Sequence, residues 1–338
     1  MNAWRKAVDN GPEESRYLPA ALKALELFPV EAEKIELVAQ SENVTFRVSV
    51  RGSNVDYVLR LHRPDYNSIE ELNSERMWTR ALGDAGEVVP VSLETCDGEH
   101  YALVDIPGAG EQRYAGMTTW YEGTPLCDFL DTCSDKEARK RVLHRLGEIA
   151  AAFHNRSSRW QAPPGFVRRR LDVDALLGEN PFWGRFWDHP DLTQSEQELL
   201  LRARTVVRAA LTGYGETPDN FSLIHADFTP ENIIFDGGDL AVIDFDDLAY
   251  GWHMYDIASA LVECRFDDDF EALQAAFLEG YRQCRDLAAR DLEVLPDFLL
   301  VRGMAIIGWY RQRPEYAGEA ETEKFKNWVV GECRRRGL

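Results

Sequence analysis

The chain has 338 residues and carries 38 basic against 58 acidic side chains, which gives a formal net charge of -20 at pH 7. Such an acidic chain is a poor match for nucleic acid or an anionic membrane, since both need a basic surface, and it slightly favours a positively charged ligand. No apolar run approaches the roughly 18 residues of a membrane span, and the N-terminus lacks the apolar stretch of a signal peptide. Because the six cysteines form no CxxC pair, we expect a cytoplasmic protein with reduced thiols, long enough for two domains.

The first part of the chain is predicted to form strands. Residues 35–39 are predicted to form one strand, and residues 44–50 alternate apolar and polar side chains as a half-buried strand does. The turn between them contains Ser41 and Asn43, whose backbone N–H groups are candidates to bind phosphate. A plain hairpin turn explains these two residues equally well.

A third predicted strand, residues 55–61, carries a candidate nucleotide-binding pair. Its alternation places the apolar residues on one face and leaves Val58 and Arg60 together on the other. A kinase uses such a pair, with a small apolar side chain beneath the adenine and a cation two residues later that reaches the phosphates. A solvent-facing arginine on an edge strand is the alternative.

The next predicted element is a helix over residues 68–82. Ser68 and Glu71 form a capping-box pattern at its start. Glu75 lies on the helix face that carries large apolar side chains, so its carboxylate needs a positively charged partner. Arg60 is the expected partner, and Glu71, one turn earlier, is the competing carboxylate for the same ion pair.

A change from strands to helices marks the boundary between two expected domains. The strand near residues 117–121 ends at a Gly/Pro break, which indicates a hinge, and the backbone groups near Thr119 and Tyr121 are candidates to contact adenine. We therefore expect a nucleotide-binding N-terminal domain over residues 1–121 and a C-terminal domain with the catalytic loop and substrate pocket over residues 122–338.

The C-terminal domain shows helical patterns and one irregular stretch. Helices are predicted over residues 134–154, 252–262, 270–284 and 295–310. The irregular stretch carries Arg168–Arg170 and Trp183–Trp187, which either border the site or wrap around the helices. His154, at the end of the first of these helices, is expected to be a structural hydrogen-bonding group.

The most informative motif surrounds two short apolar strands. Asp227 and Asn232 occur in the pattern H-x-D-x-x-x-x-N, and Asp244 follows the next strand after a turn. Phosphoryl transfer from a magnesium nucleotide needs an Asp that accepts or orients the attacking hydroxyl, and an Asn and an Asp that hold metal ions on the phosphates. Because these side chains lie at strand ends, we expect them to converge on one point. Asp, Asn and Gly are also common in turns, so ordinary turn chemistry is the alternative.

The order of these features resembles that of one superfamily. An Arg-bearing strand, a Glu-bearing helix, a hinge, the HxDxxxxN loop, the DFD sequence at 244–246 and residues 251–258 follow one another as in the aminoglycoside phosphotransferase/choline kinase superfamily. Residues 58–64 and 243–247 are similar to the bacterial homoserine kinase type II-like branch. The resemblance implies a bilobal α+β protein-kinase-like fold, with a small β-rich N-lobe containing one helix and a larger, mainly helical C-lobe. It also implies an ATP-dependent phosphotransferase with an alcohol group as acceptor.

The resemblance assigns roles to particular residues. Asp227 matches the catalytic Asp, and Asn232 and Asp244 match the magnesium ligands. Arg60, paired with Glu75, matches the cation that binds the phosphates.

Four further positions are informative in the same comparison. Asp256 matches a buried Asp that braces the catalytic loop. Arg60 stands where most members have Lys, Thr229 where many have His, and Asp246 where protein kinases have the Gly of DFG. Asp246 is expected either to assist metal binding or to accept hydrogen bonds close to the metal.

The phosphate acceptor is expected to lie between Asp227 and the helical half of the chain. Other candidates to contact it are Asp247, Tyr250, Trp252 and Trp309, although a helical Trp such as Trp309 is more often part of the core. Aromatic rings combined with an Asp would suit an amine or quaternary ammonium group.

The expected ligands and partners follow from these roles. We expect ATP and Mg²⁺ as cofactors and a small hydroxyl compound of the amino alcohol, homoserine or aminoglycoside kind as the acceptor. We expect no nucleic-acid or membrane partner, and a monomer or homodimer. The alternatives are a protein serine/threonine kinase of the same fold and a non-catalytic nucleotide-binding module.

Overall fold

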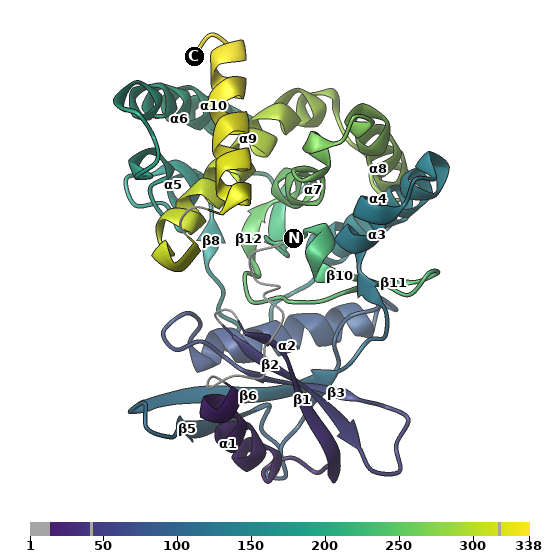
Figure 1. Ribbon diagram of the computed structural model, residues 1–338. Coiled ribbons are helices and arrows are strands. Elements are labelled where there is room, and N and C mark those ends of the chain that lie inside the picture. The colour runs from purple at the N-terminus through teal and green to yellow at the C-terminus, as the bar shows by residue number, and fades with distance from the viewer. Residues whose placement is uncertain (1–13, 41–42, 317–318) are drawn as a thin grey trace. The chain divides into compact units, whose positions relative to one another are not determined.

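The computed structural model describes residues 14–40, 43–316 and 319–338 and has the mixed α+β composition expected from the sequence (Figure 1). The described residues form two compact units. Unit 1 contains the chain up to Thr124 together with Ala162–Val167 and Ile234–Asp246, and unit 2 contains the rest. Unit 1 therefore takes in two short segments that lie beyond residue 121 in the sequence, and one of them carries Asp244 and Asp246.

Unit 1 is built around a six-stranded antiparallel sheet in the order β1-β2-β3-β6-β4, with β5 paired to β6 (Figure 1). Its strands are β1 (Ala32–Gln40), β2 (Val44–Val50), β3 (Tyr57–Leu61), β4 (Ser92–Leu93), β5 (Tyr101–Ile106) and β6 (Glu111–Thr119). Helix α1 (Glu14–Leu25) packs small side chains such as Ala20 and Ala24 into the same core as Phe46, Leu59 and Met117 of the sheet. This helix was not predicted from the sequence.

The third strand and the helix after it follow the predicted patterns. Leu59 and Leu61 are fully buried, whereas Val58 and Arg60 lie on the other, half-buried face of β3. Helix α2 (Ile69–Gly83) begins at the expected capping box, in which Ser68 and Glu71 bond to each other's backbone N–H groups. The alternation therefore directs Arg60 away from the apolar core of unit 1.

A second, smaller sheet has the order β11-β10-β7. Its strands are β7 (Thr124–Pro125), β10 (Ile233–Phe235) and β11 (Leu240–Val242). The turn between β10 and β11 is closed by Asp236, whose Oδ1 accepts hydrogen bonds from the backbone N–H groups of Gly238 (2.9 Å) and Asp239 (2.8 Å). This confirms the predicted hairpin that leads to Asp244.

Unit 2 is mainly helical. Its helices are α3 (Leu126–Thr132), α4 (Lys136–Ser157), α5 (Val173–Leu177), α6 (Gln194–Tyr214), α7 (His253–Leu261), α8 (Phe270–Cys284), α9 (Ala289–Arg311) and α10 (Ala320–Arg335). A three-stranded sheet in the order β8-β12-β9 is formed by β8 (Arg170–Leu171), β9 (Phe221–Ile224) and β12 (Ala249–Trp252). Helices α4, α7, α8 and α9 confirm the sequence prediction, and α6 and α10 are additions to it.

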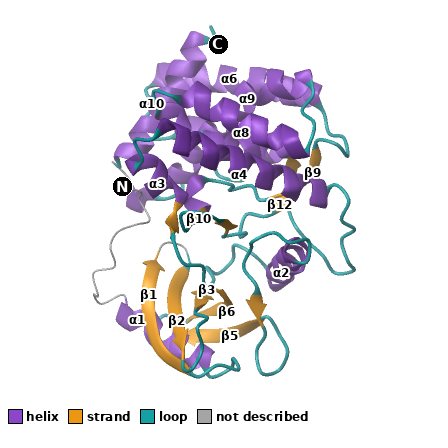
Figure 2. Ribbon diagram, turned by 90° about the vertical axis from the view of Figure 1, so that its right-hand side faces the viewer, coloured by secondary structure: helices purple, strands orange, loops and turns teal. Residues whose placement is uncertain are grey.

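Helices α4 and α8 run side by side and approach each other at glycines (Figure 2). A Cβ added at Gly280 would lie 1.9 Å from the carbonyl oxygen of His144, and one at Gly147 would lie 2.0 Å from that of Phe277. Backbone atoms of a packed helix cannot yield at such distances, so both glycines are required for this contact.

We expect Gly280→Ala to destabilise the protein by roughly 1–3 kcal/mol, because the new methyl group forces the two helices apart. The matched control is Gly213→Ala in α6, where an added Cβ meets no atom within 4 Å. That control should be stabilised by up to about 1 kcal/mol through helix propensity. Urea unfolding midpoints measure both changes, and equal midpoints for the two variants would contradict the close packing.

Candidate active site

The catalytic loop follows β9 and has a strained backbone. Ala226 has a φ of 68°, in the left-handed region that non-glycine residues rarely adopt. Asp256, in α7, holds this turn because its carboxylate accepts hydrogen bonds from the backbone N–H groups of His225 (2.9 Å) and Ala226 (2.7 Å). A buried carboxylate therefore fixes the backbone from which the Asp227 side chain projects.

Asp227 is held through both of its carboxylate oxygens. Nδ2 of Asn232 donates to Oδ2 of Asp227 (2.8 Å) and to its main-chain oxygen (2.9 Å). Arg302, from α9, donates from Nη2 to Oδ1. The Asp227 side chain is nevertheless 31% exposed, so a second molecule can reach it. Asp227 and Asn232 are thus in direct contact, and since Nδ2 of Asn232 is used as a donor, its carbonyl oxygen would be the ligand atom for the predicted metal.

A buried polar chain extends behind Asp256. His154 approaches Asp256 with Nε2 (3.2 Å) and the hydroxyl of Tyr281 with Nδ1 (2.8 Å). Burial lowers the pKa of His154 well below its ordinary value, so the ring is neutral. When the neutral ring donates from Nε2 to Asp256 and accepts at Nδ1 from Tyr281, all three side chains have a hydrogen-bond partner. This agrees with the structural hydrogen-bonding role expected for His154.

Burial raises the pKa of Asp256 from 3.8 to about 6, although the two backbone N–H groups and nearby charges favour the carboxylate. A protonated Asp256 accepts weaker hydrogen bonds, so we expect kcat to fall as the pH drops through about 6.

The free energy of unfolding is expected to depend on pH in the opposite direction. Because the pKa is raised on folding, Asp256 favours the folded state most at low pH, and that contribution is lost as the pH rises from 3.8 to about 6.

The variant Asp256→Asn tests this assignment, since its side chain stays neutral at every pH. We expect its kcat to be low and nearly independent of pH between about 5 and 8, because the loop lacks its anionic brace throughout. The measurement is kcat at saturating substrates across that range for both proteins. An acidic limb of the same shape and midpoint in the variant would show that another group titrates.

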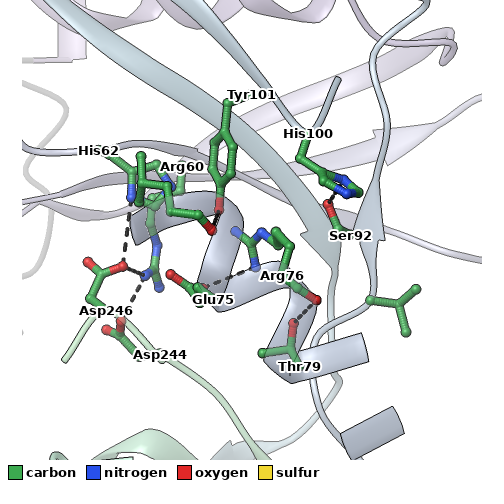
Figure 3. A network of polar contacts seen from close by, with 12 residues as sticks. Arg60, His62, Glu75, Arg76, Thr79, Ser92, His100, Tyr101, Asp244 and Asp246 are labelled. Atoms are coloured by element: carbon green, nitrogen blue, oxygen red, sulfur yellow. Dashed lines mark hydrogen bonds and ion pairs between the residues drawn. The ribbon is translucent and has the colours of Figure 1, made fainter. Parts of the chain in front are cut away.

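In unit 1, the predicted phosphate-binding cation lies among carboxylates (Figure 3). Nη1 of Arg60 lies 2.8 Å from Oδ1 of Asp244 and 3.4 Å from Oδ1 of Asp246. Burial opposes the charge on Arg60, but these two carboxylates and, more weakly, Glu75 raise its pKa. The ion pair between Arg60 and Glu75 that was expected from the sequence is therefore wrong. Arg60 forms its ion pairs with Asp244 and Asp246 instead.

Glu75 has a different partner for its own ion pair (Figure 3). Its Oε1 lies 3.1 Å from Nη1 of the neighbouring Arg76, and both side chains are buried. The guanidinium of Arg76 also lies 5.2 Å from the ring centre of Tyr101. Gly116, opposite Arg60 on β6, leaves room for this ring, because an added Cβ would lie 2.6 Å from it. Glu75 thus belongs to the same buried group as Arg60, through electrostatic attraction instead of direct contact.

Asp246 connects several segments of unit 1. Its Oδ2 accepts a hydrogen bond from Nδ2 of Asn43, and its main-chain oxygen accepts one from Nδ2 of Asn67 (3.1 Å). Nδ1 of His62 lies 3.7 Å from its Oδ1, and burial lowers the pKa of His62 to about 3, so that ring is neutral. Of the two roles expected for Asp246, the structure shows the hydrogen-bond acceptor; metal binding stays a prediction.

In unit 1, the backbone of Asp244 also lies in the left-handed region. Its φ is 63°, and its side chain is 35% exposed, so the carboxylate is accessible while Arg60 holds one of its oxygens. Among the described residues, no group of three or more His, Cys, Asp or Glu side chains is arranged as a metal site. Magnesium commonly takes only one or two protein carboxylates and completes its shell with phosphates and water, so Asp244 and the Asn232 amide fit that chemistry.

The other nucleotide-binding candidates lie on or near the sheet of unit 1. Val58 is half-buried on the same face of β3 as Arg60. The backbone N–H of Thr119 donates to the carbonyl oxygen of Val91 (3.0 Å), and the Tyr121 hydroxyl donates to that of Val89 (2.6 Å). These bonds anchor the expected hinge to residues 89–91. Ser41 lies outside the described residues.

The acceptor candidates in unit 2 have different environments. Trp252 is buried against Phe298, with ring centres 5.7 Å apart, and its Nε1 donates to a main-chain oxygen, which accounts for it as core. Trp309 is half-buried and has the guanidinium of Arg313 4.0 Å from its ring centre. Tyr250 and Asp247 are half-buried.

The irregular stretch contributes to packing in unit 2. Arg168 is buried and donates from Nε to the main-chain oxygen of Leu248. Trp183 is buried and stacks on Tyr255, with ring centres 5.7 Å apart and an interplanar angle of 4°. The second ring belongs to α7, so this part of the stretch packs against the helix that also provides Asp256.

Arg302 contacts Asp227 and was not among the residues predicted for the site. It lies in α9, in a predicted helix from which only Trp309 was a candidate, and it is the one charged residue in the apolar run over residues 298–309. A lone charge at a buried helical position needs a partner. The sequence does not say that the partner is Asp227.

Comparison with known proteins identifies the family. A model of the phosphotransferase enzyme family matches residues 34–292, which include Arg60 and the catalytic loop. The chain belongs to this family. The structure of a microcompartment-associated aminopropanol kinase has 30% sequence identity and a TM-score of 0.80, covering 94% of this chain and 95% of that one.

Two named bacterial kinases are similar to this chain over most of its length. Amicoumacin kinase of Bacillus subtilis (strain 168) is 23% identical over 302 residues, covering 86% of this chain and 84% of its own. Homoserine kinase of Sinorhizobium medicae (strain WSM419) is 27% identical over 276 residues, covering 78% of this chain and 74% of its own.

These findings confirm the superfamily, the kinase-like fold and the reaction class expected from the sequence. The chain is a phosphotransferase of the small-molecule kinase type, with a hydroxyl group as acceptor. Within residues 14–40, 43–316 and 319–338, no helix is both long and apolar enough to span a membrane.

Proposed function

We propose that this phosphotransferase moves the γ-phosphoryl group of ATP to the hydroxyl group of a small amine-bearing alcohol, such as an amino alcohol, a homoserine-like compound or an amino sugar. The observation that carries the proposal is the Asp227 carboxylate. Asn232 and Arg302 hold it on a braced loop, and it remains open to a second molecule. Such a pre-positioned carboxylate is the group that orients an attacking hydroxyl in phosphoryl transfer.

The donor side of the reaction is assigned to the residues that match the family pattern. Asn232 and Asp244 would hold magnesium, which when bound neutralises charge on the phosphate oxygens. Arg60, which keeps its charge because of Asp244 and Asp246, would bind phosphate oxygens as well. Asp246 keeps Arg60 and Asn43 in place through its own contacts.

The chemical step needs little from the protein beyond position and charge. The acceptor oxygen forms a bond to the γ-phosphorus as the bond from that phosphorus to the β,γ-bridging oxygen breaks, which leaves ADP. Asp227 accepts the hydrogen bond of the attacking hydroxyl and takes its proton late in the step. Asn232 keeps the carboxylate in one orientation throughout.

The surroundings of Asp227 favour an acceptor with positive charge. Burial, and then the negative charges of Glu321 and Asp227, raise the pKa of Glu263, which indicates electrostatic crowding among these three carboxylates. Arg302 and Lys324 oppose that shift, and Arg302 is already paired with Asp227. An ammonium group on the acceptor would relieve this crowding.

The test measures ADP release with magnesium and ATP, and separately GTP, against a panel of hydroxyl compounds. The panel holds 3-aminopropan-1-ol, ethanolamine, choline, homoserine, an aminoglycoside and a serine-containing peptide. Its matched pair is 3-aminopropan-1-ol and butan-1-ol, which differ mainly in the amino group. We expect the amine to be better in kcat/KM by roughly 10- to 100-fold, the value of one charged hydrogen bond.

The outcomes separate the alternatives. Stimulation by one or more amine-bearing alcohols supports the proposal and names the acceptor class. Stimulation by the peptide alone would instead indicate a protein kinase. Equal rates with the amine and its neutral counterpart would contradict the inferred preference for positive charge.

A further inference from the structure

Arg302 connects α9 directly to the catalytic carboxylate. Its Nη2 donates to Oδ1 of Asp227, while Nδ2 of Asn232 donates to Oδ2. The guanidinium is buried, with 8% of the residue exposed. The two oxygens of Asp227 are therefore held from two different elements of unit 2, one local to the loop and one from a distant helix.

Two aromatic rings lie beside the guanidinium and attract it independently of Asp227. The Cζ atom of Arg302 lies 5.9 Å from the ring centre of Trp183 and 6.0 Å from that of Tyr255, and these rings are stacked on each other. Gly308 allows the loop of Trp183 to approach α9, because a Cβ there would lie 2.5 Å from the main-chain oxygen of Gly184. The two rings therefore add a weak cation–π attraction to the ion pair with Asp227.

Charge reinforces this geometry. Burial opposes the charge on Arg302, but Asp227, followed by Tyr255, raises its pKa, so the guanidinium stays charged. The Nε atom of Arg302 and the Tyr255 hydroxyl are buried without a hydrogen bond of normal geometry in the described part of the chain. Arg302 therefore interacts with the Tyr255 hydroxyl electrostatically, and its hydrogen bond of normal geometry is the one to Asp227.

We propose that Arg302 is a positioning residue for Asp227, which it holds in the one orientation that receives the acceptor hydroxyl. A carboxylate has about four lone-pair positions, so the bonds from Asn232 and Arg302 define its plane and leave further positions for the acceptor. The inference rests on the proposed function, in which Asp227 orients the hydroxyl. Arg302 acts through Asp227 and need not touch the acceptor.

A double-mutant cycle with Arg302→Met and Asp227→Asn tests this inference. We expect Arg302→Met alone to lower kcat by on the order of 10²-fold, with the KM for the magnesium nucleotide changed by less than about threefold. When Asp227 is already Asn, Arg302→Met should lower kcat by less than about threefold, because Arg302 acts through the Asp227 carboxylate, which that variant lacks. Arg302→Lys should recover part of the lost kcat, since it keeps the charge but not the planar fork.

Arg139 provides a matched control. It is also buried, pairs with Asp267 and Asp269, and leaves its Nε without a partner in the described residues. Arg139→Met should lower the thermal midpoint and leave kcat at the wild-type value, whereas a similar fall in kcat for both variants would overturn the assignment.

The remaining outcomes are also decisive. Multiplicative losses in the cycle would show that Arg302 acts independently of Asp227 and would overturn the inference. If Arg302→Met does not fold, the cycle is run with Arg302→Lys, and the same non-additivity is required. Wild-type activity in Asp227→Asn alone would instead overturn the proposed function, so the two failures are distinguishable.

Discussion

Replacing Asp227 with Asn is expected to lower kcat by on the order of 10³-fold, which is the largest single effect in this protein. Asn has nearly the same shape and its Oδ1 still accepts the hydrogen bond from Arg302, but its Nδ2 cannot accept the hydrogen bond that Nδ2 of Asn232 donates to Oδ2 of Asp227. The substitution therefore removes that hydrogen bond together with the negative charge that orients the acceptor hydroxyl and takes its proton. The KM for the nucleotide should change little, because Asp227 is assigned to the acceptor.

The measurement combines steady-state kinetics with nucleotide binding by calorimetry. Asp268→Asn is the control, because Asp268 is an exposed carboxylate on the surface of unit 2. It makes the same chemical change and should leave kcat unaltered. A fall in nucleotide affinity that accounts for the whole loss in Asp227→Asn would contradict the assigned role.

Replacing Asp244 with Asn is expected to lower kcat at ordinary magnesium concentrations by on the order of 10²- to 10³-fold. The substitution isolates charge from backbone conformation, since Asp244 has a φ of 63° and Asn tolerates this region well. The neutral amide is a weaker magnesium ligand, so part of the lost activity should return as the magnesium concentration is raised. Arg60 keeps Asp246 as its second ion-pair partner.

A magnesium titration of kcat at fixed nucleotide concentration measures this effect. The control is Asp65→Asn, because Asp65 is exposed and has nearly the same backbone conformation, with a φ of 61°. That control should titrate like the wild type. An unchanged magnesium requirement in Asp244→Asn would show that Asp244 is not a metal ligand.

Each group that is assigned a role in the reaction is held by a polar contact with another side chain. Asp256 fixes the backbone at His225 and Ala226, and Arg302 fixes the carboxylate of Asp227. In unit 1, Asp246 approaches Arg60, the cation assigned to the phosphates. These contacts restrict the positions of groups that act by orientation and charge, which is the main requirement of phosphoryl transfer.

The features that sequence predicts well in this chain are local ones. The alternation over residues 55–61 predicts which face of β3 carries Arg60, because the side-chain period of a strand does not depend on its surroundings. The capping box at Ser68 predicts the start of α2 for the same reason. Asp227 and Asn232 are separated by a single turn of 3₁₀ helix, so their spacing alone brings the side chains together.

The features that sequence did not predict depend on tertiary packing. Arg60 forms ion pairs with Asp244 and Asp246 and not with Glu75, because segments far apart in the sequence lie close together in the fold. Arg302 reaches Asp227 from α9, and no periodicity specifies which loop a helix will meet. Glu75 pairs with its own neighbour Arg76, a contact that helical face analysis disfavours because adjacent residues point in different directions.

The most direct test of the central claim is detection of the phosphorylated acceptor itself. The protein is incubated with magnesium, ATP and the amine-bearing alcohol that best stimulates ADP release, and the products are followed by phosphorus NMR and mass spectrometry. The account predicts a new phosphate monoester on the acceptor, formed in equal amount to ADP and absent with Asp227→Asn. Release of ADP with inorganic phosphate as the only other product would contradict it.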